Sequence, residues 1–247
     1  LTLELEQTDI PSVSPTSPPV ENGDLFEGEP RQPNCEPPWL GTISWGTSYA
    51  LTDNGHQLAY RTNQLDLIVT EVDTAGEQPT IPTQPTISIP HTRPFFHLDW
   101  SPDNGTLAYL VYDPSGDFKL RLFNVENSDS PVAHPYEAVD NFIWSPDGQM
   151  IAYSSKVADQ LNVYLFDLRN NQSERLIMTG SHRPISWSPD GLFLALESSN
   201  DGYETSFIEI IDIVTQQSTT LTTGELCEAR PIWSPDGQKI AYLTQTT

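Results

Sequence analysis

One short phrase recurs five times along this chain and constrains its fold more than any other feature. The copies occupy residues 51–60, 100–109, 144–153, 187–196 and 233–242. Their starts are separated by 49, 44, 43 and 46 residues. This period matches a four-stranded propeller blade and is longer than an ankyrin or leucine-rich repeat. The sequence therefore predicts an all-β fold, a β-propeller of four-stranded blades with about five blades in this chain.

The residues inside each copy have the chemistry of a tight hairpin. In the third copy, Pro146 suits the first central position of a type I turn and Asp147 suits the second. Gly148 can adopt the left-handed conformation that closes a three-residue hairpin with a bulge. Asn104 takes that place in the second copy, and asparagine is the next most tolerant residue there. Each copy therefore predicts a hairpin that begins at the end of an inner strand.

Four copies begin with tryptophan, and the strands that follow the turns are apolar on both faces. Strands of this kind are typical of a sheet that packs between two others. We interpret the tryptophans as structural, each filling the space between neighbouring blades with its indole N–H hydrogen-bonded. They are Trp100, Trp144, Trp187 and Trp233.

The phrase Trp-Ser-Pro-Asp-Gly, with Ile-Ala-Tyr behind it, resembles the repeat of the TolB-type propellers. These propellers occur in bacterial periplasmic proteins and in the propeller domains of prolyl-oligopeptidase-like hydrolases. The resemblance covers about residues 40–247 and is degraded in the first copy, where the tryptophan and the proline are both missing. It implies an extracytoplasmic location, either periplasmic or at the cell surface or secreted, and a binding role.

The repeats divide the chain into two predicted parts. Residues 1–38 are expected to form an N-terminal strand and a proline-rich linker, and residues 39–247 the TolB-like propeller. The fifth copy reaches the last residue after its second strand. Two alternatives follow: a three-stranded fifth blade completed by the N-terminal strand, or a segment of a propeller of six or more blades.

The charge of the chain excludes some partners. The sequence has 11 basic and 34 acidic residues, which gives a formal net charge of −23. Such a surface repels nucleic acid phosphates and anionic membranes. No apolar run approaches the roughly 18 residues that a membrane-spanning helix needs. We therefore expect no nucleic acid partner and no transmembrane segment.

Three arginines precede a proline in the segments before the inner strands: Arg93, Arg183 and Arg230. A guanidinium group binds carboxylates and phosphates through two parallel hydrogen bonds. Our hypothesis is that the three arginines, with Asp140 and Glu228, form a ligand-binding site at the channel mouth for a protein, peptide or carbohydrate partner. The alternative is that each arginine pairs with an acidic residue of an adjacent blade.

Three histidines lie in comparable segments: His91, His134 and His182. Three imidazoles around one channel could hold a transition metal, as in propeller polysaccharide lyases. The competing interpretation is histidines without a metal, and we expect neither a metal nor a cofactor.

The chain has two cysteines, Cys35 and Cys227, which are too few for a disulfide scaffold or a four-ligand zinc site. They are predicted either to pair in one disulfide or to remain two buried thiols.

No nucleophile motif stands out. Residues 46–50 form a broken version of the hydrolase elbow around Ser48, in a region rich in strands. The sequence therefore favours a non-catalytic binding module and leaves the question of an enzyme open. One alternative is the substrate-gating propeller of a prolyl-oligopeptidase-like serine hydrolase. A second alternative is a metal-dependent propeller polysaccharide lyase.

Overall fold

The computed structural model describes residues 4–9, 49–74, 80–81, 86–91, 93–126, 132–133, 138–158, 160–176, 181–199, 205–224 and 227–245. These residues form strands and turns. Among them no helix has the length and apolar character needed to cross a membrane. The chain divides into two compact units, Leu1–Glu36 with Ile185–Thr247, and Pro37–Pro184. The predicted boundary between residues 38 and 39 lies outside the described residues.

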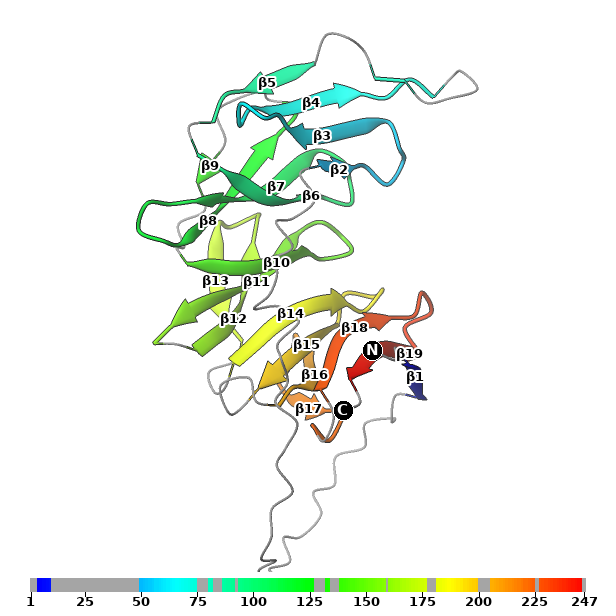
Figure 1. Ribbon diagram of the computed structural model, residues 1–247. Coiled ribbons are helices and arrows are strands. Elements are labelled where there is room, and N and C mark those ends of the chain that lie inside the picture. The colour runs from blue at the N-terminus through cyan, green and yellow to red at the C-terminus, as the bar shows by residue number, and fades with distance from the viewer. Residues whose placement is uncertain are drawn as a thin grey trace, which may run out of the picture. The chain divides into compact units, whose positions relative to one another are not determined.

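The unit Pro37–Pro184 contains three four-stranded antiparallel sheets, each with its strands in chain order (Figure 1). The first sheet consists of β2 (Tyr49–Leu51), β3 (Gln57–Arg61), β4 (Leu67–Glu71) and β5 (Ile87–Ile89). The second consists of β6 (Phe95–Trp100), β7 (Thr106–Tyr112), β8 (Phe118–Asn124) and β9 (Val132–Ala133). The third consists of β10 (Val139–Trp144), β11 (Met150–Val157), β12 (Gln160–Asp167) and β13 (Gln172–Arg175).

Two further sheets follow along the chain. The fourth consists of β14 (Ser181–Trp187), β15 (Phe193–Ser199), β16 (Phe207–Asp212) and β17 (Ser218–Thr220). The fifth has three strands in the order β1 (Glu4–Asp9), β19 (Lys239–Gln245) and β18 (Cys227–Trp233). The expected N-terminal strand therefore forms and pairs antiparallel with the last strand. The five sheets confirm the predicted all-β fold built from repeated blades.

Each inner strand ends in the predicted hairpin turn, which is stabilised by the serine of the repeat in four copies and by Thr52 in the first. Gly148 has a φ of 67°, and its N–H donates to the carbonyl oxygen of Ser145 at 2.9 Å. The Ser145 hydroxyl donates to Asp147 Oδ1 at 2.7 Å and accepts from the Met150 N–H at 2.9 Å. Ser101, Ser188 and Ser234 make the same pair of bonds in their copies.

A side chain in place of Gly148 would also meet its neighbour, because a Cβ there would lie 3.4 Å from the Pro102 ring in the preceding copy. Asn104 adopts the same left-handed conformation with a φ of 60°. The recurring phrase thus encodes a turn and the packing of one turn against the next, which supports its structural interpretation.

The apolar residues of the second sheet pack against both neighbouring sheets. In β7, Leu107 and Tyr109 belong to the core shared with the first sheet, whereas Ala108 and Leu110 belong to the core shared with the third. The fourth and fifth sheets share another core, formed by Ala195, Ile208, Ile210, Trp233, Ile240 and Tyr242. Burial on both faces follows from the doubly apolar strands seen in the sequence.

The four repeat tryptophans are all buried. The indole N–H of Trp100 donates to the Ala50 carbonyl oxygen at 3.1 Å, and that of Trp144 donates to the Asp99 carbonyl oxygen at 3.4 Å. Each of these bonds reaches the inner strand of the preceding sheet. Within the described part of the chain, the indole N–H groups of Trp187 and Trp233 have no hydrogen-bond partner.

Candidate functional site

The polar residues near the start of the inner strands lie on an irregular stretch of backbone. The pairing of β6 with β7 shifts register between Phe96 and Asp99, and that of β18 with β19 shifts between Ala229 and Ile232. A bulge of this kind changes the direction in which a side chain points. In the unit Pro37–Pro184, two groups of polar side chains result, and they differ in how completely their charges are paired.

The first group contains two of the predicted ligand residues, and they pair with each other. Arg183 on β14 contacts Asp140 on β10, with Nη2 at 2.6 Å and Nε at 2.7 Å from the same Oδ2 atom. The neighbouring Asn141 amide donates to the Pro184 carbonyl oxygen at 2.7 Å. This arrangement is the one that the alternative interpretation expected, an arginine paired with an acidic residue of an adjacent blade.

His97 adjoins this ion pair and was missed by the sequence analysis. It has a φ of 51° at the β6 bulge, and its ring stacks on Phe142 with centroids 4.5 Å apart. Burial lowers the pKa of His97 to about 4, against the opposing charge of Asp140 and with a further lowering by Arg183. The imidazole is therefore neutral at pH 7. A sequence shows no sign of a bulge at a non-glycine residue, so this position had no local signal.

The second group forms an open pocket at one end of the β6–β9 sheet, with a volume of about 260 Å³. Two of its residues, His91 and Arg93, were singled out from the sequence. The described residues that line the pocket are His91, Arg93, Val111, Tyr112, Asp113, Lys119 and Arg121.

Strand pairing explains why cations gather in this pocket. Lys119 pairs with Val111 and Arg121 pairs with Tyr109, so all four side chains share one face of the sheet. Further along the same face, Phe123 belongs to the buried core. Along β8 this face therefore changes from cationic, at Lys119 and Arg121, to apolar, at Phe123. The alternation of Lys119 and Arg121 in an expected strand is the signal that could have found them.

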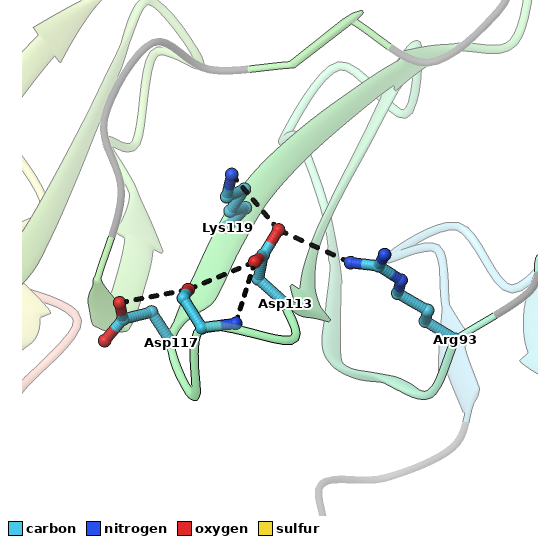
Figure 2. Close-up of polar contacts among 5 residues, drawn as sticks. Arg93, Asp113, Asp117 and Lys119 are labelled. Carbon is cyan, nitrogen blue, oxygen red and sulfur yellow. Dashed lines mark hydrogen bonds and ion pairs between the residues drawn. The ribbon is translucent and has the colours of Figure 1, made fainter.

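Asp113 holds two of the cations. Its Oδ2 atom lies 3.1 Å from Lys119 Nζ and 3.4 Å from Arg93 Nη1, and Figure 2 shows the carboxylate between the two side chains. Its Oδ1 atom accepts hydrogen bonds from the backbone N–H and the hydroxyl of Ser115, both at 3.1 Å. The Ser115 N–H first and Lys119 second lower the pKa of Asp113 to about 2. Asp113 is therefore ionised at neutral pH.

Arg121 differs from the other two cations of the pocket. Its guanidinium group is only partly exposed, and it makes no hydrogen bond or ion pair with any residue that the structure describes. Its charge is felt by its neighbours: after burial it is the second cause of the lowered pKa of His91, and it partly opposes the burial that raises the pKa of Tyr109. Arg121 is thus a cationic group of the pocket whose donors remain available.

His91 forms a wall of the same pocket. Its Nε2 atom lies 3.2 Å from the Tyr109 hydroxyl oxygen, and its ring centroid lies 4.8 Å from that of Phe95. Burial first and Arg121 second lower the pKa of His91, against the opposing charge of Asp66. With His91 neutral at pH 7, the described lining carries three positive charges and one negative charge.

The three predicted arginines occupy different positions. Arg93 lies ahead of β6, Arg183 lies within β14, and Arg230 lies at the bulge of β18 with a φ of 55°. The backbone N–H of Arg230 donates to Glu197 Oε2 at 3.1 Å, and its side chain is exposed. Glu228 is buried, and its carbonyl oxygen accepts from the Ser206 hydroxyl at 2.8 Å. Arg230 and Glu228 thus belong to the other unit.

The three candidate metal-binding histidines have separate surroundings where they are described. His91 lies in the pocket, His182 is buried in β14, and His134 lies outside the described residues. Across the described ranges, no group of three or more histidine, cysteine, aspartate or glutamate side chains is placed to hold a metal ion. The hypothesis of a metal site formed by the three histidines therefore has no geometric support among the described residues.

The structure describes one of the two cysteines, Cys227. Cys227 is buried on β18 and is disulfide-bonded. Cys35, the only other cysteine of the chain, lies outside the described residues. The predicted pairing of these two residues stays a prediction.

The model of one protein family, the TolB beta propeller domain, matches residues 63–247. The Tol-Pal system protein TolB of Francisella tularensis is 25% identical over 160 residues, which cover 63% of this chain and 36% of that protein. Dipeptidyl-peptidase 5 of Porphyromonas gingivalis is 28% identical over 123 residues, 44% of this chain and 18% of that protein. The chain thus spans little more than a third of these curated relatives at most.

Among solved structures, a putative TolB from Agrobacterium tumefaciens superposes with a TM-score of 0.58 at 18% identity. The match covers 81% of this chain and 69% of that chain. At this identity the likeness concerns the fold alone, and it agrees with the repeated sheets described above.

Proposed function

Because the chain belongs to the family of TolB beta propeller domains, we propose that it is a non-catalytic, extracytoplasmic module that binds a protein or peptide partner. The observation that carries the proposal is the charge of the pocket. Three cationic side chains surround one carboxylate there, in a chain with 11 basic and 34 acidic residues. On an acidic surface, a local positive pocket selects the part of an acidic partner that can reach it.

The relatives support a protein partner outside the cytoplasm. The TolB proteins that this chain resembles are named for the Tol-Pal system. Propellers of this type also occur in periplasmic proteins, as the sequence resemblance implied. A disulfide-bonded Cys227 agrees with an oxidising compartment, where such bonds persist.

A second candidate follows from the similarity to dipeptidyl-peptidase 5. In that case the propeller would accompany a hydrolase domain and admit its substrates, and the same pocket would contact an acidic peptide on its way to the catalytic site. This candidate predicts peptide cleavage by the full-length gene product. The first candidate predicts binding without cleavage.

The test uses three labelled peptides of equal length, one rich in Asp and Glu, one with the matching Asn and Gln, and one rich in Lys. Fluorescence anisotropy measures the affinity of the chain for each. Non-specific attraction to a chain of net charge −23 favours the Lys peptide, so tighter binding of the acidic peptide supports a dedicated pocket. Equal or tighter binding of the Lys peptide would refute the proposal.

Variants then locate the binding. Lys119→Gln should weaken the acidic peptide, whereas Lys239→Gln, on β19 in the other unit, should not. Lys119 is paired with Asp113, so the loss expected from removing its charge is about three- to tenfold, the effect of one nearby unit charge.

A further inference from the structure

Among the described residues of the pocket, Arg121 is the cation that contacts no carboxylate. Arg93 and Lys119 both contact Asp113, whereas Arg121 makes no hydrogen bond or ion pair with a described residue. A partly buried charge without a partner has lost part of its hydration and gains no compensating contact. An anion that enters the pocket would supply that contact at Arg121.

The charges present favour a group with a single negative charge. Asp113 is ionised in the same pocket, and it already draws on the other two cations. An incoming anion therefore meets the unpaired guanidinium group of Arg121 and one nearby carboxylate that repels it. The planar fork of a guanidinium group matches a carboxylate in two parallel hydrogen bonds. A doubly charged phosphate would face the same repulsion twice, and the other two cations of the described lining already share the charge of Asp113.

The walls and the size of the pocket restrict what carries this carboxylate. Val111 provides apolar surface on the face that carries Lys119 and Arg121, whereas the ring of Tyr112 contacts Phe118, its partner across the strands. The volume of about 260 Å³ is below the range of about 300–1,000 Å³ that is usual for small-molecule sites. It suits one amino acid side chain or one terminal residue, with its carbon atoms against Val111.

We infer that Arg121 receives a single carboxylate of an acidic peptide, either the side chain of Asp or Glu or the C-terminal carboxylate, while Val111 contacts the carbon atoms beside it. Arg93, Asp113 and Lys119 form the rim of this site. The inference rests on the proposed function and names the ligand chemistry of that site.

The experiment compares Arg121→Gln with wild type and with a matched control. Arg175→Gln removes an exposed arginine at the end of β13 in the same unit. The probes are acetylated peptides that differ only in a final Glu, Gln or Glu amide, and isothermal titration calorimetry measures their affinities. Arg121→Gln should weaken the Glu peptide by about 10- to 100-fold, as expected for a charged hydrogen-bonded pair. Arg175→Gln should leave the affinity within about twofold.

The amide and Gln probes distinguish the two sources of the carboxylate. If the Glu amide binds as well as the free acid, the side chain supplies it. If the Gln peptide with a free terminus binds as well, the C-terminus supplies it. If both replacements bind as tightly as the Glu peptide, either carboxylate suffices, and a fourth probe that ends in Gln amide, with no carboxylate at this residue, must bind more weakly. Full affinity of the Gln amide probe would mean that no carboxylate is recognised and that the inference is wrong.

A second measurement covers the case in which Arg121→Gln does not fold. In wild type, the Nε–Hε resonance of Arg121, assigned by its loss in Arg121→Lys, should shift when the Glu peptide is added. No shift at saturation would overturn the inference.

Failure of the inference differs from failure of the proposed function. If the Glu peptide binds and Arg121→Gln retains full affinity, the carboxylate is received elsewhere and only the inference is wrong. If wild type binds no acidic peptide, the proposed function is wrong. If trigalacturonate binds through Arg121 and peptides do not, the partner is an acidic saccharide. In that case both the proposed peptide-binding function and the inferred peptide ligand are wrong.

Discussion

Arg183 on β14 and Arg121 on β8 belong to the same unit, yet they have opposite surroundings. Arg183 makes two contacts of 2.7 Å or less with Asp140, and its side chain is 19% exposed. Arg121 makes no such contact with a described residue. The same side chain therefore stabilises the fold in one place and is available to a ligand in the other. The difference is that the Asp140 carboxylate lies opposite Arg183, whereas no described carboxylate contacts Arg121.

The largest expected effect comes from breaking the ion pair between Arg183 and Asp140. Asp140→Ala leaves Arg183 without its carboxylate and should lower the free energy of unfolding by about 2–3 kcal/mol. A fully buried pair would lose about 3–5 kcal/mol, and the partial exposure of both side chains reduces the loss. Arg121→Gln should change stability by less than about 0.5 kcal/mol, as surface substitutions do. Urea denaturation measures both variants.

The reverse result would contradict the comparison. If Arg121→Gln destabilised the chain as much as Asp140→Ala, Arg121 would be a structural residue with a partner in the folded state.

His97, beside the Arg183–Asp140 ion pair, should make the free energy of unfolding depend on pH. The pKa of His97 in the folded state is about 4, below its value of 6.5 in the unfolded chain. Between these values the unfolded state binds more protons, so stability falls as pH decreases from about 6.5 to about 4 and levels off below. The shift corresponds to at most about 3 kcal/mol, and the partial exposure of His97 makes about 2 kcal/mol the expected loss.

His97→Asn is the matched variant, because asparagine tolerates the left-handed backbone at this position. The difference between the pH profiles of the two proteins isolates His97 from Asp99, whose pKa burial raises to about 6 with the opposite effect on the slope. Parallel profiles for wild type and variant between pH 4 and 6.5 would rule out this role.

Within the open pocket, removing the competing carboxylate should strengthen binding. Asp113→Asn releases Arg93 and Lys119 and removes the negative charge that repels the ligand. Calorimetry with the Glu peptide should give an affinity about three- to tenfold higher, since one nearby unit charge contributes about 1 kcal/mol near a surface. An affinity lower than that of wild type would mean that Asp113 positions the two cations for the ligand.

The sequence contained much of the fold because its signals were local. The period of the five phrases, the turn at Gly148 and the apolar character of both strand faces each describe a few adjacent residues, and the structure has the hairpins where these signals lie. The role of the repeat serine was missed, although Ser145 is as regular as its neighbours. One of its bonds reaches the Asp147 carboxylate two residues on, and the other is accepted from the Met150 backbone N–H five residues on.

The candidate site was harder to predict because the exposure of its side chains depends on the neighbouring sheet, which is distant in the sequence. Arg93, Arg183 and Arg230 share an Arg-Pro pattern, yet they lie 7, 4 and 3 residues before their tryptophans, and the bulges of the inner strands separate them further. Arg121 shares its face with Lys119, which strand alternation could have shown. Whether that face stays open depends on the preceding sheet, which lies about 50 residues earlier along the chain.

The smallest expected effect concerns the pH dependence of binding in the open pocket. His91 lies beside Arg121 with a lowered pKa, so it is neutral at pH 7.5 and gains a proton as the pH decreases. The added positive charge, together with Arg93, Lys119 and Arg121 and against Asp113, should tighten binding of the Glu peptide. A unit charge several ångströms away in a watery site contributes about 0.5 kcal/mol, or about twofold. Calorimetry between pH 7.5 and 5.5 keeps the peptide carboxylate ionised. His91→Gln should abolish the change, and a variant that retained it would assign the titration to another group.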